Sequence, residues 1–211
     1  GVQTCALPIY LDRRSDGTCF DLYFKNEFVK RFDLPLVGDH MILNALAVIA
    51  VGIYEKTDID LIEQGLQNFE GALRRYVVEE VGDSVIIDDY AHHPTEIKVT
   101  LEATRTRFPD RKIVAIFKPH RVGRVYHFAD EFKEALEIAD EIGLCPFTSI
   151  DDYEEGIDID ITYLQNMIEG AFIVEETDED IQKLASFKPA VYVFMSSKNI
   201  YDLEDRLKDL L

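Results

Sequence analysis

The chain has 211 residues, of which 47% are hydrophobic and 30% are charged, and its formal net charge is −19. This composition is typical of a globular protein with one good core or two modest ones. The negative charge argues against a general nucleic-acid surface, because such a surface needs clustered Lys and Arg. We find no apolar run long enough to span a membrane and no stretch that resembles a signal peptide.

Acidic residues are concentrated in residues 151–180, which contain twelve Asp or Glu and no Lys or Arg. A solvated acidic face is the expected meaning, and a surface for a basic partner is the alternative. The three cysteines, Cys5, Cys19 and Cys145, do not have the spacing of a metal site. Their pattern indicates a reducing compartment, which we expect to be the cytoplasm.

Residues 1–9, GVQTCALPI, resemble the translation of a common DNA-sequencing adapter. They contain no start methionine and no clear helix or strand period, so we exclude them from the fold prediction as an expected artefact. On this interpretation Cys5 has no biological role, and the chain is a fragment of a gene whose N-terminal part is missing.

A β-hairpin is the first predicted element. Residues 19–24 and 27–32 are short aromatic-rich runs of the kind found in strands. Lys25-Asn26 between the two runs suggests the hairpin turn.

Two helices are expected next. The first covers residues 39–54, with Asp39 as a favourable N-cap, and it is apolar nearly all round, which predicts a buried helix. Asp58 is expected to cap the second helix, which runs to about Phe69. The helical pattern then breaks, and we place a domain boundary near residues 70–74.

After this boundary, strands and helices alternate. The expected strands cover residues 76–81, 84–89, 112–117, 142–145, 171–174 and 190–195. The expected helices cover residues 94–107, 126–139, 160–168, 178–185 and 199–211. Such alternation predicts an α/β, Rossmann-like domain with a mostly parallel sheet and helices on both faces.

The most informative segment is DDYAHHPTEI, residues 88–97, which follows the apolar residues 85–87. Pro94 suits the first position of a helix and Glu96 suits its first turn, so the segment is a strand-to-helix turn. In an α/β sheet such turns lie at the carboxyl edge, where ligands bind. Asp and His also serve there simply as caps and turn formers, which is the plain alternative.

Four segments in order resemble motifs of the Mur ligases. DDYAHHPTEI resembles the motif that opens the C-terminal domain of that family. GDHMILNALA, residues 38–47, resembles the family's GxHNxLNALA helix, and GALRRY, residues 71–76, resembles its GVxRRF linker. FKPHRVGR, residues 117–124, resembles its FQPHxxxR loop. The resemblance extends from about residue 18 to the C-terminus.

The resemblance implies a domain organisation and an activity. Residues 10–70 would be the C-terminal remnant of a central α/β ATP-binding domain, and residues 71–211 the C-terminal ligase domain. The implied reaction uses ATP and Mg²⁺ to add L-alanine to UDP-N-acetylmuramate in peptidoglycan synthesis. The implied partners are therefore small molecules, with no role for nucleic acid or membrane.

The resemblance also implies nucleotide-binding residues. Asn44 is expected to contact the adenine of ATP, although a backbone partner for its amide is an equally open interpretation. Arg75 is expected to reach the nucleotide, and Asp89 to accept hydrogen bonds from the ribose hydroxyls. Asp88 is expected to be a turn former.

Arg121 and Arg124 are implied to hold the carboxylate of the incoming amino acid. A guanidinium matches a carboxylate with two parallel hydrogen bonds, which fixes the direction of the amine. Pairing with nearby acids such as Asp130 is the alternative. Arg124 is the safer assignment, because the position of Arg121 varies within the family.

Tyr90, His92 and His120 are implied to line the same amino-acid pocket. His93 is expected to cap the following helix. A histidine pair also suggests a metal, but adjacent residues on an extended backbone point apart, and neither HxxxH spacing nor a Cys partner is present. We therefore assign no metal ligand in this segment.

The chain departs from the family pattern in places. Lys118 replaces the usual glutamine, and Val125 replaces a usual threonine. FMSSKNI, residues 194–200, stands where the family commonly has FMGAGDI. The loss of both glycines is expected to change the backbone near the active-site edge.

The phosphate-binding motif GxxxxGK[ST] does not occur in the chain. Because the nucleotide-sugar domain and the Mg²⁺ ligands are expected upstream, we expect the chain alone to lack ligase activity and to bind ATP weakly. A second candidate is a sister ligase with a DDFAHHPT segment that attaches a recycled tripeptide; Tyr90 and Glu96 favour the alanine enzyme. Two further candidates are a non-catalytic nucleotide-binding paralogue, favoured by the altered residues 196–199, and a metal hydrolase built on His92-His93.

Overall fold

The computed structural model describes residues 6–35, 37–69, 74–148 and 153–211, with side chains from residue 11 onward. The chain divides into two compact units, Gly1–Glu70 and Gly71–Leu211. Two expectations lie outside the described residues: the assignment of Cys5, and the first half of the linker motif at residues 71–73.

The first unit combines a three-stranded antiparallel sheet with two helices. Its elements are β1 (Ala6–Arg13), β2 (Thr18–Phe24), β3 (Glu27–Leu34), α1 (Asp39–Tyr54) and α2 (Ile59–Gln67). The predicted hairpin joins β2 to β3 and is confirmed. Lys25 and Asn26 both have positive φ, 51° and 66°, as a two-residue turn between twisted strands requires. Asp58 caps α2 as predicted by accepting from the backbone N–H of Asp60.

Strand β1 begins at Ala6, within the segment that was left out of the fold prediction. Its residues Ala6 to Ile9 pair in register with Phe24 to Asp21 of β2. The sheet order is β1-β2-β3, so β1 is an edge strand. Pro8 is compatible with an edge strand, because one side of such a strand needs no ladder hydrogen bonds. Residues 6–9 lack a clear strand period in the sequence, but the edge of β2 is available to pair with them.

Helix α1 has the predicted bounds, but its N-cap and its burial differ from the prediction. Gly38 occupies the cap position. The Asp39 carboxylate instead binds the Arg13 guanidinium through two hydrogen bonds of 2.7 and 2.8 Å.

Only one face of α1 is buried. That face packs on the sheet and α2 through Ile42, Ala45, Leu46 and Ile49. The opposite face is apolar and exposed, and includes Leu43, Val48, Val51 and Tyr54. The prediction of a helix buried all round was wrong, because the sheet and α2 of this unit cover only one side of the helix.

The second unit is built on a six-stranded sheet of order β4-β5-β9-β6-β7-β8. Its strands are β4 (Val77–Val81), β5 (Ser84–Asp89), β6 (Ile113–Phe117), β7 (Glu141–Leu144), β8 (Phe172–Ile173) and β9 (Val191–Met195). All neighbouring strands are parallel except the antiparallel pair β4 and β5. The predicted mostly parallel sheet is confirmed.

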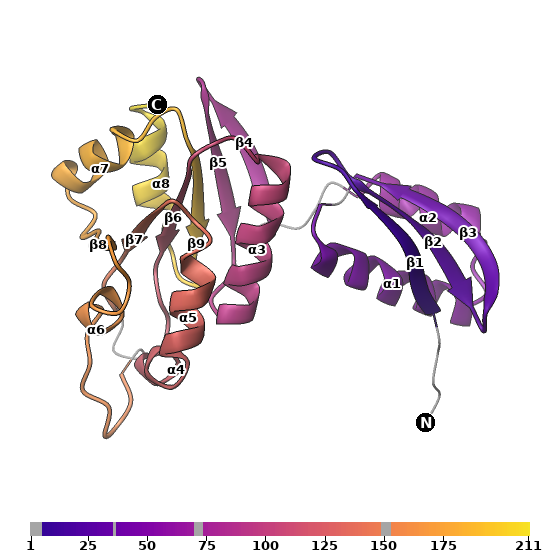
Figure 1. Cartoon of the computed structure of the whole chain (residues 1–211), viewed down its shortest axis with the longest axis horizontal. Helices are drawn as coiled ribbons and strands as arrows, with labels where there is room; N and C mark the ends of the chain where they lie inside the picture. Colours follow the sequence, from indigo (N-terminus) through magenta and orange to yellow (C-terminus); the bar gives the residue numbers. More distant parts are fainter. Residues whose placement is uncertain (1–5, 36, 70–73, 149–152) are drawn as a thin grey trace. The chain divides into compact units, whose positions relative to one another are not determined.

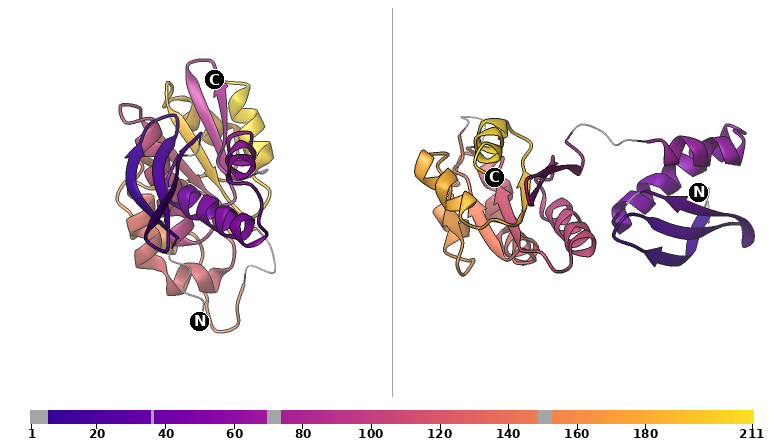
Figure 2. Two further views of the ribbon diagram at one scale, coloured as in Figure 1. Left: turned by 90° about the vertical axis from the view of Figure 1, so that its right-hand side faces the viewer. Right: turned by 90° about the horizontal axis from the view of Figure 1, so that it is seen from above.

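Helices cover both faces of this sheet, as Figure 1 and Figure 2 show. The helices are α3 (Pro94–Arg107), α4 (Val122–His127), α5 (Ala129–Leu136), α6 (Thr162–Gln165), α7 (Asp178–Ala185) and α8 (Tyr201–Lys208). Helices α3, α5 and α6 pack on one face with Ile87 and Phe117 of the sheet. Helices α7 and α8 pack on the other face with Ile86 and Tyr192. Alternate residues of each buried strand therefore serve two separate cores.

One predicted helix is divided. Residues 126–139 were expected to form a single helix, but α4 and α5 are separated by Phe128, whose φ of −120° is not helical. The Phe128 ring lies 5.2 Å from the His93 ring, so the break allows contact with the start of α3. No helix among the described residues is long and apolar enough to cross a membrane.

Candidate active-site edge

Three loops meet at the carboxyl edge of the parallel strands. They follow β5, β9 and β6, which are neighbours in the sheet. The backbone N–H of Ser196 donates to the Asp89 carbonyl at 3.1 Å, and that of Lys118 donates to the Met195 carbonyl at 3.1 Å. The Ser196 hydroxyl also donates to the Lys118 carbonyl at 2.9 Å. These bonds hold the three loops side by side.

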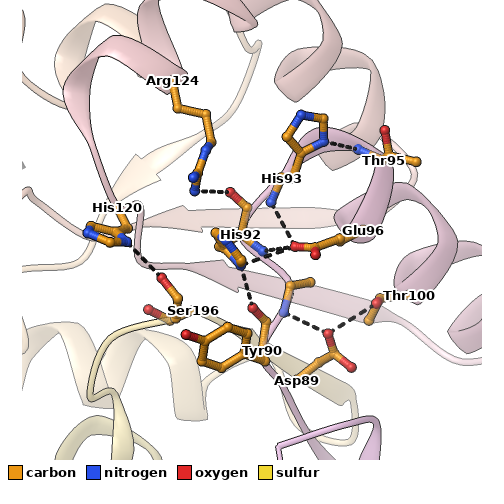
Figure 3. A network of polar contacts seen from close by, with 12 residues as sticks. Asp89, Tyr90, His92, His93, Thr95, Glu96, Thr100, His120, Arg124 and Ser196 are labelled. Carbon is orange, nitrogen blue, oxygen red and sulfur yellow. Dashed lines mark hydrogen bonds and ion pairs between the residues drawn. The ribbon is translucent and has the colours of Figure 1, made fainter.

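The turn between β5 and α3 is fixed by a helix cap. His93 is the N-cap residue, and its Nδ1 accepts from the backbone N–H of Thr95 at 3.3 Å. The Glu96 carboxylate accepts from the backbone N–H groups of His92 and His93 at 2.9 and 3.1 Å. Pro94 occupies the first helical turn. The predicted helix start and the capping role of His93 are confirmed, and Figure 3 shows the contacts.

Asp89 is buried, and both of its carboxylate oxygens accept hydrogen bonds from the same domain. Oδ1 accepts from the backbone N–H of Ala91 at 2.7 Å and from the Thr100 hydroxyl at 3.3 Å. Oδ2 accepts from the backbone N–H of Tyr76 at 2.8 Å. Burial raises the pKa of Asp89, and the hydrogen bonds from Ala91 and Tyr76 act in the opposite direction. Asp89 thus joins the residues before β4 to the start of α3.

Asp88 is not a turn former, which corrects the prediction. It lies within β5, opposite Val77 of β4, and its side chain faces the second core near Glu204 of α8. The strand continues through Asp89 because residues 85–89 pair with β9 along their whole length. Burial, and then the nearby Glu204 carboxylate, raise the pKa of Asp88 to about 6.

Tyr90 lies close to two arginines. The guanidinium carbons of Arg74 and Arg75 are each 5.2 Å from the centre of the Tyr90 ring, a cation–π distance. The backbone N–H of Tyr90 donates to the Arg74 carbonyl at 2.8 Å. Arg75 is exposed. The structure therefore brings the predicted residues Arg75 and Tyr90 together.

His92 has one preferred tautomer. Its Nδ1 lies 3.0 Å from the Tyr90 carbonyl oxygen and 3.1 Å from Glu96 Oε2. Both oxygens are acceptors, so Nδ1 carries a proton and Nε2 is the ring nitrogen not used in these contacts. The ring packs edge-on against Tyr90, with centres 5.2 Å apart. Figure 3 shows the His92 and His93 rings pointing in different directions.

Arg124 of α4 reaches the same turn. Its Nη1 donates to the His92 carbonyl at 3.2 Å. Among the described residues, no carboxylate, Asp130 included, lies within ion-pair distance of Arg124. His120 Nδ1 lies 3.1 Å from the Ser197 hydroxyl. The structure therefore gathers Tyr90, His92 and Arg124 at one edge, with His120 in the neighbouring loop.

The other two predicted residues are placed differently. Arg121 is exposed and precedes α4 with a φ of 68°, a conformation that residues with a side chain rarely adopt. Asn44 belongs to the first unit and is exposed on the outer, apolar face of α1. Its amide is therefore not a buried group that requires a partner within its own unit.

Sequence reasoning missed Arg74 and Ser196. Arg74 was expected only to be part of the linker motif at residues 71–76, but its guanidinium donates to the carbonyls of Ser196 and Lys198. The loss of both family glycines in residues 196–199 was the signal that could have indicated these contacts, because a loop without glycine needs other residues to fix its backbone. Within the described residues, no group of three or more His, Cys, Asp or Glu could hold a metal ion.

Comparison with known families identifies the class of the chain. The family described as "Mur ligase, glutamate ligase domain" matches residues 74–199, which is more than half of the chain. The chain belongs to the Mur ligase family.

Three solved structures are similar to this chain. UDP-N-acetylmuramate–alanine ligase MurC from Thermotoga maritima has a TM-score of 0.75 and 25% identity, covering 96% of this chain and 45% of that protein. The murein peptide ligase Mpl from Psychrobacter arcticus has a TM-score of 0.68 and 21% identity, covering 96% and 43%. The MurF ligase from Thermotoga maritima, solved in complex with ADP, has a TM-score of 0.72 and 17% identity, covering 97% and 46%. The last two show a shared fold, and the chain spans less than half the length of each protein.

Proposed function

We propose that the chain is the C-terminal part of an ATP-dependent ligase that adds L-alanine to UDP-N-acetylmuramate. The observation that carries this proposal is the cluster of Tyr90, His92 and Arg124 at the carboxyl edge of the sheet, in a chain of the Mur ligase family. In the proposed reaction ATP phosphorylates the lactyl carboxylate, the alanine amine attacks the acyl phosphate, and phosphate leaves. The product is a peptidoglycan precursor, made in the cytoplasm for cell-wall biogenesis, cell division and cell shape.

We assign residues 10–70 to the end of a central ATP-binding domain and residues 71–211 to the ligase domain. The division of contacts between Glu70 and Gly71 supports this assignment. Residues 1–9 stay assigned to adapter sequence, although Ala6 to Ile9 pair with β2. The phosphate-binding loop and the Mg²⁺ ligands are expected in sequence upstream of this chain, so the chain alone is expected to have no ligase turnover.

Arg124 is proposed to bind the carboxylate of the amino acid, and Arg121 to assist it. A guanidinium has five N–H donors, and among the described residues Arg124 makes one hydrogen bond, to the His92 carbonyl. The remaining donors can form the two-pronged contact that a carboxylate accepts.

The His92 ring and the Tyr90 ring would line the side of the pocket where the amine lies. Because His92 Nδ1 faces the Tyr90 carbonyl and the Glu96 carboxylate, Nε2 is the ring atom that can accept a proton from the ammonium group. Catalysis by these residues is then mainly positioning of the amine and neutralisation of charge.

Asn44, Arg75 and Asp89 are proposed to bind the nucleotide. The exposed face of α1 offers the Asn44 amide beside the apolar side chains of Leu43 and Val48, which suits a flat base with polar edges. A carboxylate has about four lone-pair sites. Asp89 uses three of them within the domain, which leaves one for a ribose hydroxyl.

A tripeptide-adding ligase is the second candidate. The similarity to the murein peptide ligase favours it, and the altered residues 196–199 leave a non-catalytic paralogue as a third. The slightly higher identity to the alanine ligase, together with Tyr90 and Glu96 in the motif, favours the alanine enzyme.

Nucleotide binding tests the proposal on the chain itself. ADP titrated into the 211-residue chain by calorimetry should bind weakly, and Asn44→Ala should weaken binding by about tenfold through the loss of hydrogen bonds to the base. Asn68→Ala, an exposed amide at the end of α2, is the matched control and should bind like the unmodified chain. Equal affinity for the unmodified chain and Asn44→Ala would contradict the assignment of the base site.

A further inference from the structure

Arg74 has an unusual backbone conformation that the surrounding contacts maintain. Its φ is 57°, in the left-handed region that residues with a side chain rarely occupy. Its carbonyl oxygen accepts the backbone N–H of Tyr90 at 2.8 Å, which fixes it against the turn after β5. A rarely populated conformation persists only where neighbouring structure enforces it, and such residues are frequent at functional sites.

The Arg74 guanidinium makes contacts on several sides. Its Nη2 donates to the carbonyl of Ser196 and to that of Lys198, the latter at 2.9 Å. Its carbon atom lies 5.2 Å from the centre of the Tyr90 ring and 5.3 Å from that of the Tyr201 ring. The side chain is 18% exposed, so these contacts form in a largely desolvated environment.

Residues 196–199 contain no glycine, and none of them has a positive φ. Their own side chains fix part of the loop. The Ser196 hydroxyl accepts the backbone N–H of Lys198 at 2.9 Å and donates to the Lys118 carbonyl. The Ser197 hydroxyl lies 3.1 Å from His120 Nδ1. The loop is therefore connected to the loop after β6 through Ser196 and Ser197, and to Tyr90 through Arg74.

We propose that Arg74 is a positioning residue for the amino-acid pocket. One guanidinium holds the Tyr90 ring and residues 196–199 at the same time, and the loop in turn places His120 through Ser197. Arginine suits this task because its flat face stacks on a ring while its N–H groups donate to two carbonyls; lysine lacks the flat face. The role in the pocket rests on the proposed ligase function, whereas the effect on the loop does not.

The test compares Arg74→Gln and Arg74→Lys with Arg111→Gln in the 211-residue chain. Arg111 is a matched control because its guanidinium also donates to two backbone carbonyls, those of Asp83 and Ala190, at the opposite edge of the same sheet. Amide hydrogen exchange is measured across residues 196–199. The ring-nitrogen NMR signals of His120 are measured in parallel, with His120→Gln used for their assignment.

Both Arg74 variants should raise amide exchange in residues 196–199 by about tenfold, because each loses hydrogen bonds to a charged donor. Both should also shift the His120 signals, while Arg111→Gln changes neither. Tyr201→Leu, which removes one stacking ring and retains Arg74, should raise exchange in the same residues by a smaller factor. This variant also keeps the test decisive if Arg74→Gln fails to fold.

Unchanged exchange in residues 196–199, an equal increase in Arg111→Gln, or full rescue by Arg74→Lys would each overturn the proposal. In the full-length ligase, Arg74→Gln should raise KM for the amino acid and leave KM for ATP unchanged. A loop effect without any ligase activity would contradict the proposed function alone, so the two failures are distinguishable.

Discussion

Asp88 and Asp89 are neighbours in the chain but have different surroundings. Side chains alternate along β5, so Asp89 faces the core beneath α3 and Asp88 faces the core beneath α8. Asp89 accepts three hydrogen bonds from its own domain. Asp88 Oδ1 and Glu204 Oε2 are buried and have no hydrogen-bond partner. The two acids therefore have different roles although they share one motif.

The surroundings of Asp88 predict a pH-dependent stability. Its folded-state pKa of about 6 lies above the ordinary value of 3.8, so the folded state favours the protonated carboxyl. The stabilisation is present below about pH 4 and is lost as the pH rises through about 6. Asp88→Asn should flatten this part of the stability profile and raise Tm at pH 7 by a few degrees.

Thermal unfolding between pH 4 and pH 7 checks this prediction. Asp83→Asn, an exposed acid in the turn between β4 and β5, is the control and should retain the slope of the unmodified chain. If Tm of Asp88→Asn decreases with pH as steeply as that of the unmodified chain, the burial of Asp88 is not the cause.

At the scale of single residues, the sequence predicted which chemical groups lie at the site better than it predicted their burial and their contacts. The motif indicated that acids, a phenol and imidazoles share one turn, and the structure brings Tyr90 and His92 together. The motif did not show whether Asp88 lies in the buried strand or in the turn, because this depends on how far β5 continues to pair with β9. It also did not predict the contacts of Arg74, because they join residues more than 120 positions apart.

Helix α3 shows which elements local signals can predict. Pro94 and Glu96 predicted its start, and their effects are local: a fixed φ and acceptors for unpaired N–H groups. The division of α4 from α5 at Phe128 and the pairing of β1 with β2 depend on contacts with other elements. Periodicity within one segment could not show either of them.

The cap of α3 predicts a stability effect. Glu96→Ala removes the acceptor for the N–H groups of His92 and His93, and should lower the free energy of unfolding by about 1 kcal/mol. Glu102→Ala, an exposed glutamate on the same helix, is the matched control. Urea denaturation measures both variants. Equal midpoints for the two would show that the cap contributes nothing measurable.

The whole molecule consists of two units, and each contains residues to which we assign a role. The first unit carries Asn44 on an exposed helix face, and the second carries Tyr90, His92 and Arg124. From the order of motifs in the sequence, we assigned Asn44 to one domain and Tyr90, His92 and Arg124 to another. Helix α1 was predicted to be buried because its composition is apolar, and composition alone does not show how many faces a unit covers.

For the whole protein, we propose that the edge formed by Tyr90, His92 and Arg124 binds the amino acid in an ATP-dependent ligation. The most direct test of this proposal uses the protein expressed with its upstream coding sequence. Mass spectrometry then identifies the products that this protein forms. The substrates are ATP, Mg²⁺, UDP-N-acetylmuramate and, in separate reactions, L-alanine, glycine, L-serine or a murein tripeptide.

We expect an amide product with L-alanine. We also expect Arg124→Lys to raise KM for alanine by roughly tenfold to a hundredfold, since the two-pronged contact with the carboxylate is lost. Arg107→Lys, on the last turn of α3, should behave like the unmodified enzyme. A product formed only with the tripeptide, or an unchanged KM for alanine in Arg124→Lys, would contradict the proposed role of this edge.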